Sequence, residues 1–409
     1  MRRFRALLLP AFAALFCLNL SAQNFTVLHT FTGSNDGASP FATLTMDAAG
    51  NLYGTAEAGG SQGAGTVFKL TNRSSGWLLT TLYSFTGGED GAQPRSSVIF
   101  GPDGRLYGNT YAGGNPICGG CGTIYSLRPQ PQACASANCS WQESTLYQFP
   151  DAQDGQAFPW GNLLFDAAGN IYGTTLAGGG IVYKLSPGLQ GWTYQTLYSF
   201  VYSEQARQPY AGVISDTAGN LFGTTYGGGS NDDCWQLQSC GTVFELSPAG
   251  SSWVLTIIHD FDGNDGGLPI GGLISDRFGN LYGANSMGVI YMLSPAGGSW
   301  SFSNLATVEI TCDVWILGPS CGPWDTLAMG ADGSLYGTSR ASGLYAYGNV
   351  FRLTPSNGGW IYDDLHDFTN GSDGSAPIGG VTLDASGNLY GTTAGGGSAG
   401  VGVVFEITQ

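Results

Sequence analysis

Apolar and polar positions alternate along the chain in short segments that recur. The string GNLYGT at 50–55 returns six more times in close variants such as GRLYGN, GNIYGT, GNLFGT and GSLYGT. Each copy is followed by a second apolar string, such as VFKL or VFEL. A third segment begins at a Trp and reaches a Phe eight residues later in all but one copy. Segments of this length and periodicity predict short β-strands.

Each copy is expected to form four antiparallel strands, A to D. Strand A resembles GGLISD (271–276), strand B is NLYGT, strand C resembles GTVFEL (241–246), and strand D begins at the Trp. The A–B turn is D-x-x-G-N in five copies and G-x-D-G in the other two, which suits hairpin turns with Gly or Asn at positive φ. Seven copies of about 55 residues, with four strands each, predict an all-β fold, a seven-bladed β-propeller.

The two ends of the repeat array are complementary. The seventh copy stops at strand C (403–408) and lacks a strand D, whereas residues 25–31 read as a strand D without a preceding copy. The N-terminal strand is therefore expected to complete the last blade and close the ring. Closure would remove the exposed edge strands that promote aggregation.

A targeting segment precedes the repeats. Arg2, Arg3 and Arg5 come before an apolar stretch at 6–20, and Leu20-Ser21-Ala22 offers small residues for cleavage. This pattern predicts a signal peptide over 1–22 and a propeller over 23–409. The stretch is short for a membrane-spanning helix, and no second apolar run of that length follows. The mature chain is thus expected to be secreted, extracellular or periplasmic.

Composition narrows the classes of partner. Thirteen Lys and Arg oppose 29 Asp and Glu, so the formal net charge is −16. Such a surface repels phosphate backbones and anionic lipids, which argues against nucleic-acid and membrane-surface binding. A content of 67 Gly and 12% aromatic residues favours strands and tight turns over helices.

Eight cysteines remain after Cys17, and they fall into four close pairs. The pairs are Cys118 with Cys121, Cys134 with Cys139, Cys234 with Cys240, and Cys312 with Cys321. An even number in an exported chain predicts local disulfides. Zinc is the alternative for the first two pairs. The strand assignment places those pairs on opposite faces of the propeller, which disfavours a shared metal ion.

The pattern LYGTT…GG…GTVF…W resembles the Gloeo/Verruco-type (GloVer) tandem repeat of exported bacterial proteins, and the resemblance covers residues 24–409. It implies an extracellular propeller, often followed by a C-terminal sorting anchor that this sequence does not show. The family brings no established activity and no catalytic residues. The kelch repeat is a more distant likeness.

The three histidines are expected to be structural. His29, His259 and His366 occupy the strand D position that is Tyr in other copies, where a ring with a polar edge suits a half-buried outer strand. This interpretation leaves no histidine for a Ser-His-Asp triad or a metal site.

Two sets of aspartates recur with the repeat. One lies in the A–B turn and the other in the D–A loop; their members are Asp47, Asp166, Asp216, Asp276 and Asp384, and Asp36, Asp90, Asp154, Asp265 and Asp373. Either set could bind calcium, but hydrogen bonding to the loop backbone explains both more simply. We therefore expect no cofactor, with calcium as the alternative.

The position after the loop proline at the start of strand A is the most informative. Its seven residues are Phe41, Arg95, Trp160, Tyr210, Ile270, Trp324 and Ile378. Strand A is the innermost strand, so these side chains are expected to surround the mouth of the central channel. The long B–C loops add Tyr111, Asp232, Asp233, Trp235, Arg340, Tyr345 and Tyr347. Aromatic residues and Arg are common ligand anchors, although packing between blades is the alternative explanation.

The sequence thus predicts a monomeric, non-catalytic propeller that binds a carbohydrate or an extended peptide at this mouth. A polysaccharide hydrolase or lyase is the second hypothesis, and it would need two convergent carboxylates. Asp232 and Asp233 are adjacent in one loop and are expected to point in different directions. A purely structural surface or matrix protein is the third hypothesis.

Overall fold

The computed structural model describes residues 23–130, 141–150, 155–201, 206–230, 234, 239–308 and 321–409. The predicted signal peptide lies outside these residues. Within them, no helix has the length and apolar character needed to cross a membrane.

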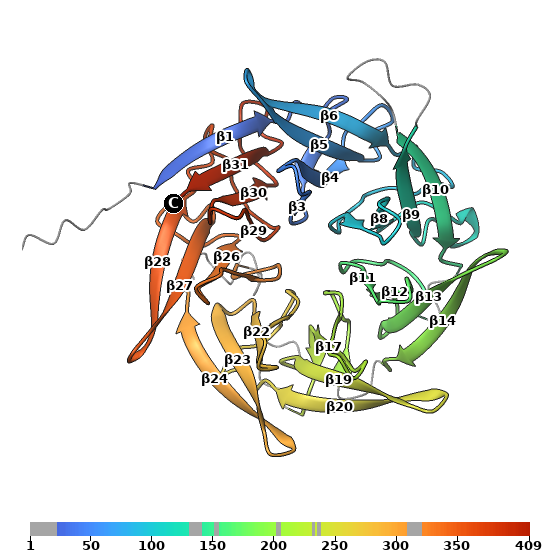
Figure 1. Ribbon diagram of the computed structural model, residues 1–409, viewed down its shortest axis with the longest axis vertical. Coiled ribbons are helices and arrows are strands. Elements are labelled where there is room, and N and C mark those ends of the chain that lie inside the picture. Colours follow the sequence, from blue (N-terminus) through green and yellow to red (C-terminus); the bar gives the residue numbers. More distant parts are fainter. Residues whose placement is uncertain are drawn as a thin grey trace, which may run out of the picture.

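The chain forms seven blades around a central axis (Figure 1), as predicted. Blade one comprises β3 (Thr45–Met46), β4 (Leu52–Ala58), β5 (Thr66–Arg73) and β6 (Gly76–Ser84). Blade two comprises β7 (Ile99–Phe100), β8 (Leu106–Thr110), β9 (Thr123–Pro129) and β10 (Trp141–Gln148). Blade three comprises β11 (Leu164–Phe165), β12 (Ile171–Thr175), β13 (Ile181–Gly188) and β14 (Gly191–Ser199). Blades four and five comprise β16 (Ile214–Ser215), β17 (Leu221–Thr225), β19 (Thr242–Ala249) and β20 (Ser252–Asp260); β21 (Ile274–Ser275), β22 (Leu281–Ala284), β23 (Val289–Ala296) and β24 (Ser299–Thr307).

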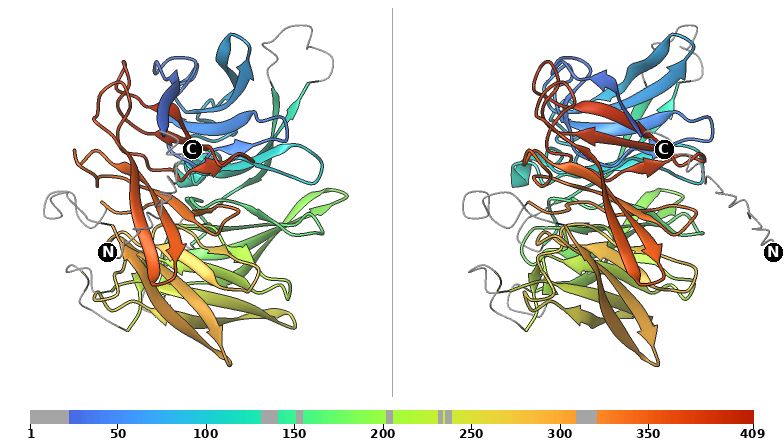
Figure 2. Two further views of the ribbon diagram at one scale, coloured as in Figure 1. Left: turned by 60° about the vertical axis from the view of Figure 1, so that its left-hand side comes forward. Right: turned by 90° about the vertical axis from the view of Figure 1, so that its left-hand side faces the viewer.

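Blades six and seven complete the ring. Blade six comprises β25 (Ala328–Met329), β26 (Leu335–Ser339), β27 (Asn349–Ser356) and β28 (Gly359–Asp367). Blade seven comprises β29 (Thr382–Leu383), β30 (Leu389–Thr393), β31 (Val403–Thr408) and the N-terminal strand β1 (Asn24–Thr30). Short additional elements lie in the loops: β2 (Ala38–Pro40), β15 (Ala206–Arg207), β18 (Gly227–Gly228) and the 3-10 turn η1 (Pro116–Cys118). Side views show the blades stacked around the ring, with connecting loops on both faces (Figure 2).

The N-terminal strand closes the ring, which confirms the prediction. The last sheet has the order β1-β31-β30-β29, and β1 pairs antiparallel with β31 from Asn24 opposite Thr408 to Thr30 opposite Val403. The ring is therefore closed by hydrogen bonds between the two ends of the propeller (Figure 1).

A glycine in strand B of every blade makes room for an aromatic ring of strand C. A Cβ on Gly54 would lie 2.5 Å from Cζ of Phe68, and one on Gly223 would lie 2.6 Å from Cζ of Phe244. The same approach occurs at Gly108, Gly173, Gly283, Gly337 and Gly391. None of these glycines has a positive φ. The LYGT string therefore has Gly at this position because a side chain there would overlap the aromatic ring of strand C.

Aromatic contacts join each blade to the next. The Phe at the end of strand D packs on the strand C aromatic of the following blade, as Phe85 does on Tyr125 with ring centroids 5.0 Å apart. The strand D Trp packs against the strand B aromatic of the preceding blade, and Trp77 contacts Tyr390 in this way across the closure. The described residues form seven buried clusters, one at each blade interface.

The aspartates of the A–B turns hold the turns together, as the simpler interpretation predicted. Oδ1 of Asp47 accepts hydrogen bonds from the backbone N–H groups of Ala49 and Asn51, and Oδ2 accepts from Asn51 Nδ2 and Tyr53 Oη. Burial raises the pKa of such a carboxyl, but the hydrogen bonds outweigh it. The pKa therefore lies below its usual value at Asp47, Asp166, Asp276 and Asp384.

The histidines pair with the D–A loop aspartates. Nε2 lies 3.2 Å from Asp36 Oδ2 in His29, and the same pairing joins His259 to Asp265 and His366 to Asp373. Tyr83 makes the equivalent bond to Asp90. This equivalence confirms a structural role for the strand D position.

Two of the predicted disulfides are present. Cys118 is bonded to Cys121 and Cys234 to Cys240. Cys321 is also disulfide-bonded, whereas its predicted partner Cys312 and the pair Cys134 and Cys139 lie outside the described residues. A disulfide has no thiolate to offer, so the structure does not support zinc binding at Cys118 and Cys121.

Replacing Gly223 by Ala is expected to destabilise the propeller by about 1–3 kcal/mol, because the new methyl group would overlap the Phe244 ring. Chemical denaturation of the mature chain measures the change. Gly358 is the matched control, since a Cβ there meets nothing within 4 Å and φ is not positive. Gly358→Ala should change the free energy of unfolding by less than about 0.5 kcal/mol. Equal effects of the two substitutions would contradict the packing explanation.

Replacing Tyr183 by Phe is expected to stabilise the fold by about 1 kcal/mol. The Tyr183 hydroxyl is buried and has no hydrogen-bond partner among the described residues, whereas blades one, four, six and seven carry Phe at this position. The free energy of unfolding of Tyr183→Phe, compared with the wild type, tests this expectation. A loss of stability would mean that the hydroxyl has a partner.

Acidification is expected to destabilise the propeller below about pH 4. The four turn carboxyls have folded-state pKa values below the usual 3.8, so the unfolded chain binds protons more readily. Their stabilisation is complete above the unfolded pKa and is lost as the pH falls through the folded values. Melting temperatures across this range test the effect, and Asp276→Asn should show a smaller loss on acidification. A melting temperature that does not change with acid would contradict the role of these turns.

Candidate ligand-binding site

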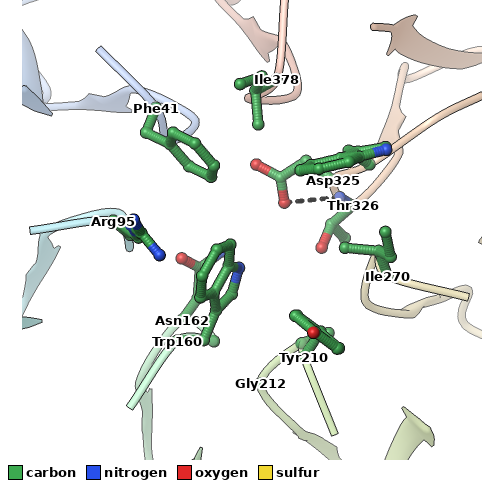
Figure 3. Close-up of a pocket in the computed structure, with 13 residues that line it drawn as sticks. Phe41, Arg95, Trp160, Asn162, Tyr210, Gly212, Ile270, Asp325, Thr326 and Ile378 are labelled. Atoms are coloured by element: carbon green, nitrogen blue, oxygen red, sulfur yellow. Dashed lines mark hydrogen bonds between the residues drawn. The ribbon is translucent and has the colours of Figure 1, made fainter. Parts of the chain in front are cut away.

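The start of the innermost strand of each blade places seven side chains around one end of the channel. All seven predicted residues line a single pocket there (Figure 3); they are Phe41, Arg95, Trp160, Tyr210, Ile270, Trp324 and Ile378. We call this pocket the mouth. Each residue follows the proline that precedes strand A, so the repeat itself sets the ring.

An aromatic belt occupies the side of the mouth formed by blades one to four. Trp160 lies at its centre, with edge-to-face contacts to Phe41 at 5.6 Å and to Tyr111 and Tyr210 at 5.4 Å between ring centroids. Tyr210 continues the belt to Tyr226 at 5.3 Å. Edge-to-face contacts fix the rings relative to one another. The belt is thus a preformed apolar surface whose rings are all half-buried.

Arg95 is held within this belt. Its guanidinium carbon lies 4.1 Å from the Tyr111 ring centroid and 4.5 Å from that of Trp160, and its Nε donates to Glu57 Oε1 at 2.9 Å. Cation–π contacts and an ion pair together orient the side chain and balance its charge. Arg95 therefore supports the aromatic belt.

The opposite side of the mouth is smaller and less aromatic. Ile270 of blade five and Ile378 of blade seven lie on this side and are buried (Figure 3). Blade six, which stands between these two blades, contributes Trp324. The guanidinium of Arg340 lies 4.5 Å from the Trp324 ring centroid, and burial lowers the pKa of Arg340. The indole N–H of Trp324 is buried and has no hydrogen-bond partner among the described residues.

A polar layer lies directly below the aromatic rings. Asp325 Oδ2 accepts hydrogen bonds from Thr43 Oγ1 at 2.6 Å and from the Gly380 N–H at 3.0 Å. Asn162 Oδ1 accepts from the Ser97 N–H at 2.9 Å. These bonds connect blades six, seven and one, and blades two and three. The carboxylate of Asp325 is therefore fixed by the channel wall.

The polar layer narrows the channel. The cavity at the mouth measures about 40 Å³, and a second chamber of about 330 Å³ lies beyond it. Asn162, Gly212 and Thr326 line both, so they form the constriction between the two. Pockets that enclose a small molecule measure about 300–1,000 Å³. The mouth admits water, and a larger ligand would rest on the rim.

Other predicted site residues lie at different distances from the mouth. Tyr111 contacts the ring of Trp160, and Arg340 lies over the ring of Trp324, so both residues are next to the mouth. Tyr345 and Tyr347 are exposed and do not line it. Trp235, Asp232 and Asp233 lie outside the described residues.

Two acidic residues at or next to the mouth were not predicted, namely Asp325, which lines it, and Glu57, which pairs with Arg95. Asp325 stands where the other copies have Ala, Ser or Gly, so an alignment of the seven copies could have found it. Glu57 lies near the end of β4, at a position whose residue type differs from copy to copy, so the repeat gives no common residue from which it departs. Asp325 is the one carboxylate among the thirteen residues that line the mouth. Within the described chain, no group of three or more His, Cys, Asp and Glu residues is placed to hold a metal ion.

Solved structures of proteins from several bacteria resemble this fold. A putative 6-phosphogluconolactonase from Bacteroides uniformis is 14% identical over 81% of this chain and 84% of its own, with a TM-score of 0.52. A protein from Lactobacillus plantarum is 15% identical over 88% of this chain and 99% of its own, with a TM-score of 0.53. The extracellular domain of a putative hybrid two-component system from B. thetaiotaomicron is 12% identical over 94% of this chain and 41% of its own, with a TM-score of 0.53. Identities this low show a shared fold alone.

No functionally curated protein matches the sequence. The family comparison gives a clear result, because the profile of the Gloeobacter/Verrucomicrobia repeat matches residues 12–139, 135–309 and 284–409. These three overlapping regions together span residues 12–409, which include all seven blades. The chain therefore belongs to the Gloeobacter/Verrucomicrobia repeat family.

Proposed function

We propose that this chain is an exported binding protein that takes an uncharged carbohydrate on the rim of its mouth. The observation that carries the proposal is the aromatic belt around Trp160, which presents several half-buried rings side by side. The apolar faces of sugar rings stack on such surfaces, as apolar ligand faces do on aromatic pocket walls in general.

The charges at the mouth favour an uncharged ligand. Arg95 is paired with Glu57, and Asp325 is engaged by Thr43 and Gly380. A charged ligand would have to compete with these partners, and a buried charge that loses its partner is costly.

The size of the mouth favours binding across the rim. A cavity of about 40 Å³ is too small to enclose a sugar ring, whereas the belt extends from Phe41 to Tyr226. An oligosaccharide that lies along the belt would contact several rings at once. An extended peptide is the alternative ligand of the same surface, and it is an outcome of the test below.

Catalysis and a purely structural role remain alternative hypotheses. A hydrolase or lyase would need a second carboxylate to act with Asp325, and a structural protein would not need a solvent-facing aromatic belt.

Export is supported by the disulfides, which persist in oxidising compartments.

Binding of neutral oligosaccharides should be weakened by Trp160→Ala at least tenfold, or by about 1.4 kcal/mol. The ring of Trp160 contacts Phe41, Tyr111 and Tyr210, so its removal opens the centre of the belt. A glycan array of the mature chain identifies the best oligosaccharide, and calorimetry then measures the affinity of each variant. Trp160→Phe should retain part of the affinity because it keeps an aromatic face.

Tyr345→Ala is the matched control, because Tyr345 is an exposed aromatic residue outside the mouth. This variant should bind as the wild type does. The proposal fails if the array shows no neutral glycan, if only peptides bind, or if Trp160→Ala binds unchanged. Melting temperatures show whether each variant is folded.

A further inference from the structure

A second pocket lies on the opposite face of the ring, between blades four and five. It is formed by the A–B turns of both blades and by the sheet residues beneath them, and its volume is about 650 Å³. Phe222, Phe278 and Trp300 provide aromatic walls, Asp216, Glu245 and Asp276 provide carboxylates, and Arg277 provides one guanidinium. This volume lies in the range of pockets that hold small ligands.

Blades one and three show what occupies this place elsewhere in the ring. Lys69 is paired in register with Tyr53, and its Nζ lies 5.2 Å from the Tyr53 ring centroid. Lys184 stands over Tyr172 in the same way, at 5.4 Å. Each tyrosine also donates its hydroxyl to the aspartate of the A–B turn. A cation on an aromatic face, beside an acid, is therefore a recurrent arrangement of this fold.

Blade four changes both members of this register pair. Phe222 replaces the tyrosine and Glu245 replaces the lysine. Because Phe222 has no hydroxyl, Asn220 is the one described residue whose side chain donates to Asp216 Oδ2, at 2.8 Å. Asp216 is exposed, whereas the turn aspartates of blades one, three, five and seven are half-buried.

Blade seven shows that a glutamate at this strand C position can be satisfied by a hydrogen bond within its own blade. Glu406 occupies the position of Glu245, but it accepts a hydrogen bond from Tyr390 Oη at 2.8 Å. Glu245 faces the ring of Phe222, which has no hydroxyl, and its Oε1 accepts from Ser247 Oγ at 3.0 Å. The combination of Phe and Glu leaves two carboxylates beside an aromatic ring that has no cation from its own blade.

The turn of blade five adds a wall to this pocket. Arg277 and Phe278 stand where the D-x-x-G-N turns of the other blades have small residues, and Phe278 is 70% exposed. The guanidinium of Arg277 lies 4.7 Å from the Phe278 ring centroid, and Arg277 forms no ion pair with another described residue. The exposed ring of Phe278 extends the aromatic surface towards solvent.

We propose that this pocket binds the cationic side chain of a lysine-containing peptide, which takes the place that Lys69 and Lys184 fill in blades one and three. Asp216 and Glu245 complement the ammonium group, and Phe222, Phe278 and Trp300 contact its alkyl chain. The net charge of −16 attracts basic segments to the surface, and the pocket selects a side chain. This site is independent of the mouth on the other face.

Fluorescence anisotropy with a labelled oligolysine peptide tests the proposal on the mature chain. Glu245→Lys restores the arrangement of blades one and three, so it should fold and should weaken peptide binding at least about tenfold. Glu89→Lys is the matched control, because Glu89 is exposed in a loop of the other face and the charge change is the same. It should weaken binding by less than about twofold.

A variant that keeps the net charge distinguishes the contribution of the pocket to peptide binding from that of the overall charge. Phe278→Ala removes an exposed wall without changing the charge or the core, and it should weaken binding about threefold or more. Binding by the wild type should weaken as NaCl rises from about 0.1 M to about 1 M, because the Debye length falls from about 10 Å to about 3 Å. Equal effects of Glu245→Lys and Glu89→Lys would overturn the proposal. So would a wild-type chain that does not bind the peptide, or one that instead binds neutral glycans through Phe278.

Discussion

The close approach of a strand C ring to a strand B glycine is the constraint on which the rest of this propeller depends. Because Gly54 and its equivalents carry no side chain, the tip of the Phe68 ring and of its equivalents can approach the neighbouring strand closely. The Phe from the preceding blade then packs on that ring, as Phe31 does on Phe68. The strand C ring thus takes part both in the contact between strands B and C of its own blade and in the packing against the preceding blade. This explains why the LYG string recurs even though its glycines have ordinary strand conformations.

The sequence was sufficient to predict the number of blades, the closure and the ring of residues at the mouth. Each of these follows from position within the repeat, and repeated positions such as Phe41 and Trp160 must occupy equivalent places around the axis. The repeat could not show that Arg95 is engaged by Glu57, because the pairing depends on side-chain directions in two different blades. Nor could it show the narrow channel, which results from hydrogen bonds such as that of Thr43 to Asp325 across blade seven. Tyr345 and Tyr347 were predicted at the mouth from loop length, but loop length does not fix where a loop points.

Departures from the repeat mark the two candidate sites. Around the mouth, blades one, three, four and six have an aromatic residue and blade two has Arg95, where blades five and seven have isoleucine, which makes the ring asymmetric. On the other face, Phe222 and Phe278 depart from the residues common at their positions, and Glu245 lies beside them in the same pocket. A shared framework of Gly, Trp and Phe fixes the backbone, so single substitutions can change one groove without disturbing the other six.

The pairing of β1 with β31 also has a consequence for how the molecule folds. A hydrogen bond at this closure joins residues 384 positions apart in the chain, from Thr408 to Asn24. Contacts of such long range form slowly, because the loop entropy must be overcome before the contact stabilises anything. Six blades can assemble from neighbouring segments, but the seventh must wait until both ends of the propeller are present. Until then β31 presents an unpaired edge to other chains. The time during which this molecule is most prone to aggregate is therefore set by the docking of a single seven-residue strand.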